Sequence, residues 1–299
     1  MRRMITRQAT RLTVVLSTLL AFITACSSSN LRTPPPTLPT STPPQTLTAT
    51  LSPTPEPTGT ATPLACLTQP GIVEKDTLES TKPTQEYFIY LPPCYEEKVD
   101  KRYPVLYLLH GQTFTADQWI RIGAVDAADA LILSGETMPF IIVFPDDRYW
   151  NQPSGAGFGS RLVNDLVPFI DQTYRTLPDP RYRAIGGLSR GAGWAIRLGL
   201  TRPDLFSVIG LHSLAVFQRD ASKIDDWIMA IPPDSRPIIY MDIGENDREL
   251  ASVLQIEEQL TQLNLPHEWH LYSGEHTEEY WSAHVEGYIR WYAEQWDHQ

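Results

Sequence analysis

Several short runs of apolar residues constrain the fold of this chain more than any other feature. Residues 104–110 read PVLYLLH and residues 140–145 read FIIVFP, so the side chains on both faces of each segment are mostly apolar. Strands of this kind are buried on both faces, as they are in a parallel sheet covered by helices. Segments with apolar residues at helical spacing, such as 162–174, lie between the runs. The alternation predicts an α/β fold with a mainly parallel central sheet and helices on both faces.

The same patterns predict the remaining elements. Further strands are expected at 87–91, 183–186, 207–211, 237–242 and 268–272, and further helices at 192–200, 249–264 and 278–296. In an open parallel sheet, ligand-binding and reacting residues gather at the carboxyl ends of the strands. We therefore look for candidate site residues in the loops that follow these strands.

The N-terminus has the features of an export signal. Residues 1–25 contain four arginines and no acid, and the apolar run 12–23 is shorter than the ~20 residues that span a bilayer. The sequence Ile23-Thr-Ala-Cys26 follows, and it resembles the lipobox of bacterial lipoproteins, in which the signal is cleaved before a cysteine that is then lipidated. We expect a signal peptide over 1–25 and a lipid anchor on Cys26. An ordinary signal peptide that contains a cysteine is the alternative.

Residues 26–64 are dominated by Ser, Thr and Pro, as in TPPPTLPTSTPPQTLTAT. Such a composition buries too little apolar surface to offset chain entropy, so we expect a disordered linker before a folded domain at 65–299. The whole chain carries a net charge of −11, which argues against nucleic acid as a partner. The expected protein is a monomer held outside the cytoplasm by a lipid anchor in the cell membrane.

Two cysteines remain if Cys26 is lipidated. Cys66 and Cys94 both precede the expected core. In an oxidising compartment a lone pair of cysteines most simply forms a disulfide, which would stabilise the fold by roughly 3–4 kcal/mol. Two free buried thiols are the alternative.

A serine among glycines carries the strongest chemical signal. Residues 187–191 read GLSRG, a G-x-S-x-G pattern centred on Ser189. It lies between an expected strand and an expected helix, the setting of a nucleophile elbow, where small residues two positions before and after the serine avoid steric clashes. A glycine-rich turn with an N-capping serine is the alternative.

Such a serine needs an acid and a base later in the chain, in that order. Asp247 follows the strand expected at 237–242 and His276 follows the strand expected at 268–272. These positions predict Ser189, Asp247 and His276 as a catalytic triad, in which the histidine takes the serine proton and the aspartate orients the histidine. Asp242 is expected to be structural, and Glu245 is the fallback for the acid.

An oxyanion hole requires two backbone N–H groups. Those of Gln112, in the loop after residues 104–110, and of Arg190 are the candidates. His110 is expected to shape this loop, and His212 could line the site. Surface or packing roles are expected for His267, His270, His284 and His298.

Longer stretches carry a family resemblance. They read YPVLYLLHGQTFTADQW, IIVFPDDR, DLVPFIDQTYRTLPDPRYRAIGGLSRGAGWAIRLGLTRPDLF and YSGEHTEEYW. Together they resemble the putative-esterase family of α/β-hydrolases over roughly residues 84–292. This family includes esterase D, feruloyl and acetyl-xylan esterases, enterochelin-type esterases and mycolyltransferases. The resemblance implies the α/β-hydrolase fold and the same triad of Ser189, Asp247 and His276.

The chain departs from the family pattern at two places. The family often has methionine and a further glycine where this chain has Arg190 and Ala192, and some members have glycine in place of Gln112. Both oxyanion donors are backbone groups, so the departures affect substrate choice rather than activity. Arg190 either meets an anionic group of the substrate or pairs with a neighbouring acid.

The expected function is that of a serine carboxylic-ester hydrolase acting through an acyl-enzyme on Ser189. The substrate class is a small or carbohydrate-linked ester of the feruloyl or acetyl type. An acyltransferase with the same triad and a non-catalytic binding lipoprotein are the alternatives. No metal or cofactor is expected, because the histidines and acids lack a ligand spacing such as H-E-x-x-H. Four aromatic residues either bind a sugar or phenolic ring or belong to the core: Trp119, Tyr149, Trp150 and Trp281.

Overall fold

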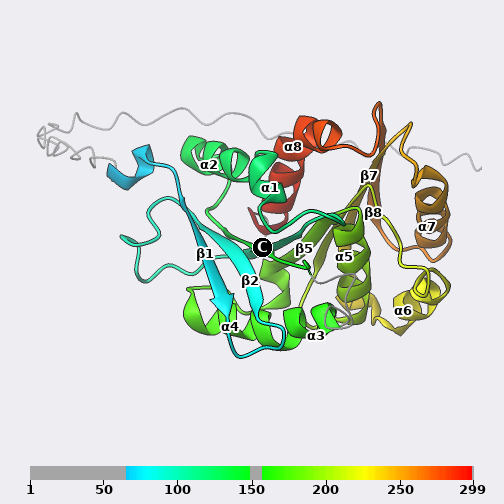
Figure 1. Ribbon diagram of the computed structural model, residues 1–299, viewed down its shortest axis with the longest axis horizontal. Coiled ribbons are helices and arrows are strands. Elements are labelled where there is room, and N and C mark those ends of the chain that lie inside the picture. The colour runs from blue at the N-terminus through cyan, green and yellow to red at the C-terminus, as the bar shows by residue number, and fades with distance from the viewer. Residues whose placement is uncertain (1–64, 149–156, 298–299) are drawn as a thin grey trace, which may run out of the picture. The chain divides into compact units, whose positions relative to one another are not determined.

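A computed structural model describes residues 65–148 and 157–297 of the chain (Figure 1). The expected signal peptide, Cys26 and the linker lie outside the described residues, as do Tyr149, Trp150 and His298. In the described part, no helix combines the length and the apolar character needed to cross a bilayer.

The described residues form an eight-stranded sheet with the order β1-β2-β4-β3-β5-β6-β7-β8. The strands are β1 (Ile72–Leu78), β2 (Gln85–Leu91), β3 (Val105–Leu109), β4 (Ile141–Pro145), β5 (Arg183–Leu188), β6 (Val208–His212), β7 (Ile238–Gly244) and β8 (His267–Tyr272). The pairs β1–β2 and β2–β4 are antiparallel, and the other five pairs are parallel. The expected mainly parallel sheet is confirmed.

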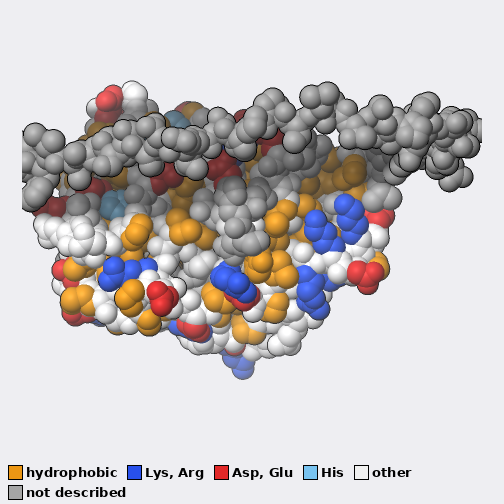
Figure 2. Space-filling model, turned by 180° about the vertical axis from the view of Figure 1, so that it is seen from behind, with side chains coloured by type: hydrophobic (Ala, Val, Ile, Leu, Met, Phe, Trp, Pro, Cys, Tyr) orange, Lys and Arg blue, Asp and Glu red, His pale blue; other side chains and the backbone are white. Residues whose placement is uncertain are grey.

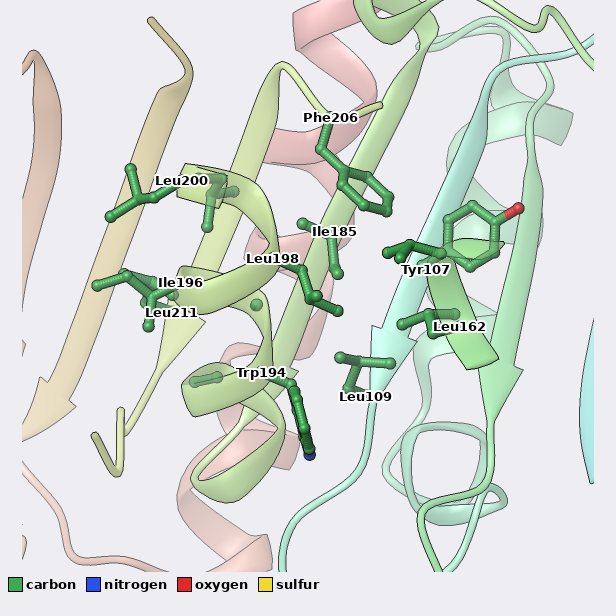
Figure 3. Close-up of a cluster of buried hydrophobic side chains, with 14 of the residues drawn as sticks. Tyr107, Leu109, Leu162, Ile185, Trp194, Ile196, Leu198, Leu200, Phe206 and Leu211 are labelled. Atoms are coloured by element: carbon green, nitrogen blue, oxygen red, sulfur yellow. The ribbon is translucent and has the colours of Figure 1, made fainter. Parts of the chain in front are cut away.

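Helices cover both faces of this sheet, as expected (Figure 1). They are α1 (Gln118–Arg121), α2 (Ala124–Ser134), α3 (Phe158–Arg161), α4 (Val167–Thr173), α5 (Arg190–Thr201), α6 (Ile224–Ala230), α7 (Leu250–Gln262) and α8 (Glu278–Asp297). One buried cluster joins the sheet to α3 through α7, and Figure 3 shows part of it between α5 and the strands. A second cluster joins the other face to α1, α2 and α8. The helix expected over 162–174 begins earlier, at Phe158, and contains a π-helical segment, Leu162–Leu166.

The sequence analysis missed β1, α1, α2 and α6. Strand β1 lies at the edge of the sheet and is exposed along most of its length, so its side chains carry no burial pattern. Helix α2 buries mainly alanines, which give a weak helical periodicity. Helices α1 and α6 span only four and seven residues, which is too short for a clear helical periodicity.

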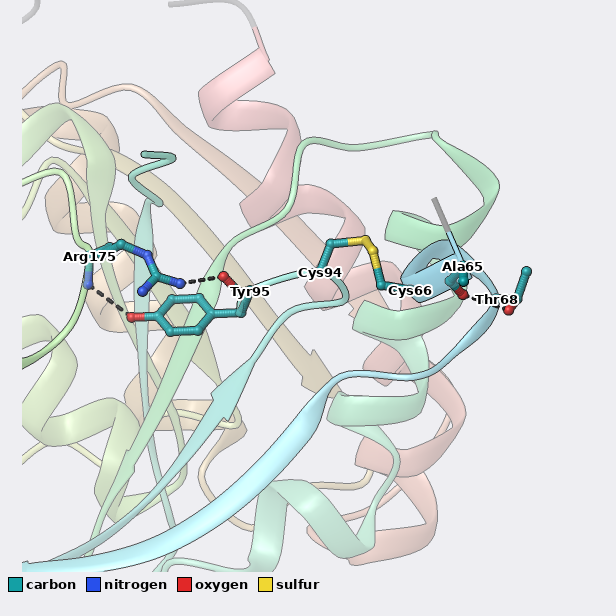
Figure 4. The surroundings of a disulfide bond; sticks show 6 residues. All are labelled: Ala65, Cys66, Thr68, Cys94, Tyr95 and Arg175. Atoms are coloured by element: carbon teal, nitrogen blue, oxygen red, sulfur yellow. Dashed lines mark hydrogen bonds between the residues drawn. A yellow bond between two sulfur atoms is a disulfide. The ribbon is translucent and has the colours of Figure 1, made fainter. Parts of the chain in front are cut away.

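Cys66 and Cys94 form the expected disulfide across a separation of 28 residues (Figure 4). It joins the short helical turn Ala65–Thr68 to the segment that follows β2. The next residue, Tyr95, accepts a hydrogen bond from the Arg175 backbone N–H at 3.0 Å. The start of the described region is therefore tied covalently to the segment after β2.

Charged side chains of both signs lie on the face of the protein seen in Figure 2. On the face seen in Figure 2, where described residues are visible, Lys and Arg lie among apolar and acidic side chains rather than forming one continuous basic surface.

The position of the Tyr292 hydroxyl explains why two neighbouring strands, β5 and β6, carry glycine. An added Cβ at Gly186 of β5 would lie 1.8 Å from Tyr292 Oη, and one at Gly210 of β6 would lie 1.6 Å from it. Tyr292 belongs to α8, and its Oη forms a hydrogen bond of 2.9 Å with His212 Nε2. Helix α8 can approach the sheet this closely only because both strand positions lack a side chain.

Gly210→Ala is therefore expected to lower the free energy of unfolding by more than about 2 kcal/mol, because the tightly packed tyrosine cannot move aside. Gly287→Ala, at an exposed position of α8 with nothing within 4 Å of the added Cβ, is the control. It is expected to raise stability by about 1 kcal/mol, since alanine is the better helix former. Urea denaturation measures both. Equal effects of the two substitutions would contradict this account of the packing.

Candidate active site

Ser189 occupies a sharp turn between β5 and α5. Its backbone has φ 53° and ψ −112°, a conformation that a residue with a Cβ rarely adopts and that costs roughly 1–3 kcal/mol. An added Cβ at Gly187 would lie 2.2 Å from the carbonyl carbon of Gly191, and one at Gly191 would lie 2.1 Å from the Leu109 carbonyl oxygen. Glycine is required at both positions, so the local geometry is that of the predicted nucleophile elbow.

The predicted base and acid are in direct contact. His276 Nδ1 lies 2.9 Å from Oδ1 and 2.8 Å from Oδ2 of Asp247. With the proton on Nδ1 donated to this carboxylate, Nε2 is left as the nitrogen that can accept a proton. Asp247 Oδ1 also accepts the Glu249 N–H at 2.8 Å. Burial alone would raise the pKa of Asp247, but the hydrogen bonds from His276 and the Glu249 amide outweigh it, so the pKa lies below its ordinary value.

The two other candidate acids lie elsewhere. Asp242 Oδ1 lies 2.6 Å from His212 Nδ1, and its Oδ2 accepts the hydroxyls of Tyr280 and Tyr288. Glu245 accepts the Ser273 hydroxyl at 2.9 Å. Of the three acids considered, Asp247 is the one that contacts His276.

Ser189 and His276 line one cavity of about 210 Å³. Its other lining residues are Gly111, Gln112, Thr113, Phe114, Arg248, Thr277, Glu278 and Trp281. Within the described chain, no hydrogen bond joins the Ser189 hydroxyl to the imidazole. Such contacts are often long without substrate and shorten in the substrate complex.

The loop after β3 contains Gln112, whose backbone N–H is one of the two expected oxyanion donors and which lines the cavity with Ser189. The Gly111 carbonyl accepts hydrogen bonds from the His110 ring at 2.8 Å and from the Phe114 N–H at 3.3 Å. In a trans peptide the next N–H points the opposite way, so the N–H of Gln112 faces away from His110. Arg190 begins α5, where the first N–H groups have no acceptor within the helix. His110 shapes this loop, as expected.

The side chain of Arg190 pairs with an acid, which decides between the two alternatives for it. Its Nε lies 3.0 Å from Asp147 Oδ2, and its guanidinium lies over the Phe217 ring. Trp119 is wholly buried and donates to the Leu109 carbonyl, so it belongs to the core. Trp281 lines the cavity and meets the His276 ring edge-on at 5.1 Å.

The idea that His212 lines the site is wrong. Its ring is completely buried between Asp242 and Tyr292, on the side of the sheet covered by α8. Only its backbone reaches the nucleophile, because its carbonyl accepts the Ser189 N–H at 2.9 Å. Side chains alternate in direction along a strand, and the location of His212 at a strand end did not fix its side.

Sequence reasoning also missed residues around the cavity. Arg248 directly follows the candidate acid, and Glu278 follows the candidate base by two positions, so proximity to Asp247 and His276 could have found both. The tyrosines that surround Asp242 and His212 recur at intervals of four or eight along α8, at positions 280, 288 and 292, which places them on one helix face. In the described residues, one group has the spacing of a metal site, Cys66, Cys94 and Glu97, and both of its sulfurs are in the disulfide.

Comparison with known proteins now places this geometry in a family. Residues 79–292 match the family described as "Putative esterase". The chain belongs to this family. A Xylanibacter ruminicola protein named endo-1,4-beta-xylanase/feruloyl esterase is 31% identical over 182 residues, 57% of this chain and 24% of that protein. A Mycobacterium tuberculosis esterase is 28% identical over 152 residues, 46% of this chain and 31% of that protein. The chain thus spans about a quarter to a third of these curated relatives.

Solved structures of esterases share the fold of this family member. A ferulic acid esterase superposes with a TM-score of 0.68 at 26% identity, covering 76% of this chain and all of that one. An S-formylglutathione hydrolase from Staphylococcus aureus has a TM-score of 0.60 at 18% identity, covering 75% of this chain and 98% of that one. The α/β-hydrolase fold and the family resemblance expected from the sequence are confirmed.

The strain at the elbow predicts an unusual order of stability. Ser189→Gly and Ser189→Ala both remove the hydroxyl, but only glycine adopts φ 53° without a Cβ penalty. The glycine variant is expected to be more stable than the alanine variant by about 1 kcal/mol. The same pair of substitutions at Ser207, where φ is not positive, should give the opposite order. Thermal denaturation of the four variants decides, and an alanine variant at 189 that matches the glycine variant would argue against strain.

Proposed function

We propose that the protein is a serine carboxylic-ester hydrolase with Ser189, Asp247 and His276 as its catalytic triad. One observation carries the proposal. The serine of a strained elbow shares a cavity with a histidine whose other nitrogen is bound to a buried carboxylate. This combination of nucleophile, base and orienting acid is the arrangement that acyl transfer requires.

In the first half of the reaction, His276 Nε2 takes the Ser189 proton as the Oγ attacks the ester carbonyl carbon. Asp247 holds the imidazole in the tautomer that leaves Nε2 free and stabilises the imidazolium that forms. The negative charge on the former carbonyl oxygen is placed against the N–H groups of Gln112 and Arg190. Collapse of this intermediate breaks the ester C–O bond, and His276 returns the proton to the leaving alcohol.

The second half repeats the chemistry with water. His276 takes a proton from water as the oxygen attacks the acyl-Ser189 carbonyl carbon. Collapse then breaks the bond to Ser189 Oγ, which regains its proton, and the carboxylic acid leaves. Because the pKa of Asp247 lies below its ordinary value, this carboxylate stays ionised at neutral pH, which the imidazolium steps require.

The proposed substrate is a feruloyl- or acetyl-type ester, small or linked to a carbohydrate. The X. ruminicola relative is named an endo-1,4-beta-xylanase/feruloyl esterase, and one of the matched solved structures is a ferulic acid esterase. The cavity offers the aromatic rings of Phe114 and Trp281 beside Ser189, which suits a phenolic acyl group. Polar groups of Gln112 and Glu278 on the same lining suit a hydroxyl-rich leaving group.

A panel of esters tests this function directly. Purified protein is expected to hydrolyse p-nitrophenyl acetate and methyl ferulate, with Ser189→Ala lowering kcat by at least about 10⁴-fold because no nucleophile remains. Ser207→Ala serves as the control and should retain activity, because this half-buried serine lies just before β6 and its hydroxyl bonds the Pro180 carbonyl. Absence of turnover on every ester of the panel, or turnover that survives in Ser189→Ala, would refute the proposal.

We also propose that the protein works outside the cytoplasm as a lipid-anchored monomer. The basic and apolar N-terminus, the lipobox-like residues before Cys26 and the Ser/Thr/Pro-rich segment support this placement. The Cys66–Cys94 disulfide is consistent with an oxidising compartment.

Cys26→Ser is expected to move the full-length protein from the detergent phase to the aqueous phase in Triton X-114 partitioning, because acyl chains supply the affinity for the membrane. Wild-type protein that partitions into the aqueous phase would contradict the lipid anchor. The Cys26→Ser variant should hydrolyse soluble esters at the wild-type rate.

A further inference from the structure

We propose that Asp147 is a positioning residue that keeps the two backbone donors of the oxyanion hole, the N–H groups of Gln112 and Arg190, at a fixed distance and direction from each other. The inference rests on the proposed function, in which the Gln112 and Arg190 N–H groups form the oxyanion hole. Asp147 follows β4, and in the sheet β3 lies between β4 and β5. A single residue in the loop after β4, Asp147, therefore contacts the segments that follow β3 and β5.

The first contact reaches the loop after β3. The Asp147 N–H donates to His110 Nε2 at 2.8 Å, so this nitrogen carries no proton and the ring proton is on Nδ1. Nδ1 then donates to the Gly111 carbonyl at 2.8 Å. This hydrogen bond fixes the peptide plane whose other end is the Gln112 N–H. The direction of one oxyanion donor thus depends on the backbone of Asp147.

The second contact reaches the start of α5. Asp147 Oδ2 accepts hydrogen bonds from Arg190 Nε at 3.0 Å and from Trp194 Nε1 at 2.9 Å. These two residues are four apart on the helix, so they lie on one face of its first turns. The carboxylate therefore holds the helix end from which the Arg190 N–H, the other oxyanion donor, projects.

The location of this carboxylate is costly, which indicates a role beyond packing. Asp147 is 4% exposed, and burial raises the pKa of Asp147 even though the Arg190 guanidinium offsets part of the effect. Its Oδ1 has no hydrogen-bond partner among the described residues. Buried ion pairs seldom repay their desolvation in stability. The pair instead fixes the distance between two segments that must both contact one oxygen atom.

The chain supplies a matched control pair on the same helix. Arg197 Nε lies 2.5 Å from Asp220 Oδ2, and Asp220 is 3% exposed. The guanidinium of Arg197 lies over Trp194 and Phe217, the two rings that Arg190 also covers. Asp220 follows β6 by several residues and contacts neither oxyanion segment through a described hydrogen bond. Asp220 matches Asp147 in burial and in its arginine partner, but it does not connect the loop after β3 to the start of α5.

The test compares Asp147→Asn with Asp220→Asn, and adds Arg190→Met, which removes the guanidinium but keeps the backbone N–H. The first readout is the rate at which a fluorophosphonate labels Ser189, a step in which Oγ bonds to phosphorus, fluoride leaves and the serine proton passes to His276. The second is kcat and KM on p-nitrophenyl acetate. The third is the inhibition constant of phenylboronic acid, which forms a tetrahedral adduct on the serine.

Asp147→Asn and Arg190→Met are each expected to lower the labelling rate and kcat about tenfold, less than the 10²–10³-fold loss of a whole donor. KM should stay within about twofold, the boronic-acid inhibition constant should rise about tenfold, and the double variant should match the single ones because they break one link. Asp220→Asn should stay within about twofold of wild type in all three readouts.

The positioning role is overturned if Asp147→Asn, folded by circular dichroism, labels at the wild-type rate, or if Asp220→Asn loses as much. It is also overturned if Asp147→Asn changes KM and leaves kcat intact. If wild-type Ser189 is not labelled at all, the proposed function fails and this inference falls with it. If wild-type Ser189 is labelled and Asp147→Asn is labelled at the same rate, the proposed function stands and only the role of Asp147 is refuted.

Discussion

The close approach of three backbone segments at the carboxyl end of β5 is the constraint on which the rest of the site depends. Gly187 and Gly191 allow the strand, the turn and the helix α5 to come within contact distance, and Gly191 also packs against the end of β3. A side chain at either position would force the segments apart. The turn would then open, and the Ser189 side chain would no longer project from its tip. The glycines provide space, and the strain at Ser189 is the consequence.

A buried polar cluster beneath this turn connects the nucleophile to the base. The His212 carbonyl accepts the Ser189 N–H, and the His212 ring is held by Asp242 and Tyr292. Tyr280, on the same helix as Tyr292, donates to Asp242 at 2.7 Å. Helix α8 begins two residues after His276, so the helix that anchors the cluster also fixes the loop of the base. Polar networks in a core hold a unique geometry when every member has a partner.

Burial and the adjacent carboxylate explain why this cluster behaves as a set of fixed donors. Burial raises the pKa of Tyr288 well above its ordinary value, and the charge of Asp242 raises it further. The phenol therefore keeps its proton and donates it to Asp242 at 2.6 Å. The cluster carries a histidine and an aspartate that resemble a second catalytic pair, but it is wholly buried. Its part is to hold β6, β7 and α8 together.

The sequence allowed the fold class, the strands of the parallel core and the elbow to be predicted because those features are local. Apolar runs mark strands buried on both faces, and the glycines around Ser189 lie within four residues of each other. The direction of a side chain at a strand end is not local in this sense, which is why His212 was misplaced. The edge strand β1 was missed for the related reason that exposed positions carry no pattern.

The bridge through Asp147 could not have been predicted, because it depends on strand order. In the chain these strands follow in the order β3, β4, β5, but in the sheet β3 lies between β4 and β5, so residues 110, 147 and 190 become neighbours only in the folded sheet. The arginine at position 190 has a consequence that follows from this order. Its charged group lies beside Trp194 and Phe217 in a largely apolar region, where an unpaired cation would be costly. A carboxylate at the end of β4 is the group that the topology brings within reach, and Asp147 already contacts His110 through its backbone. Neutralising the arginine and fixing the oxyanion loop are therefore two effects of a single residue.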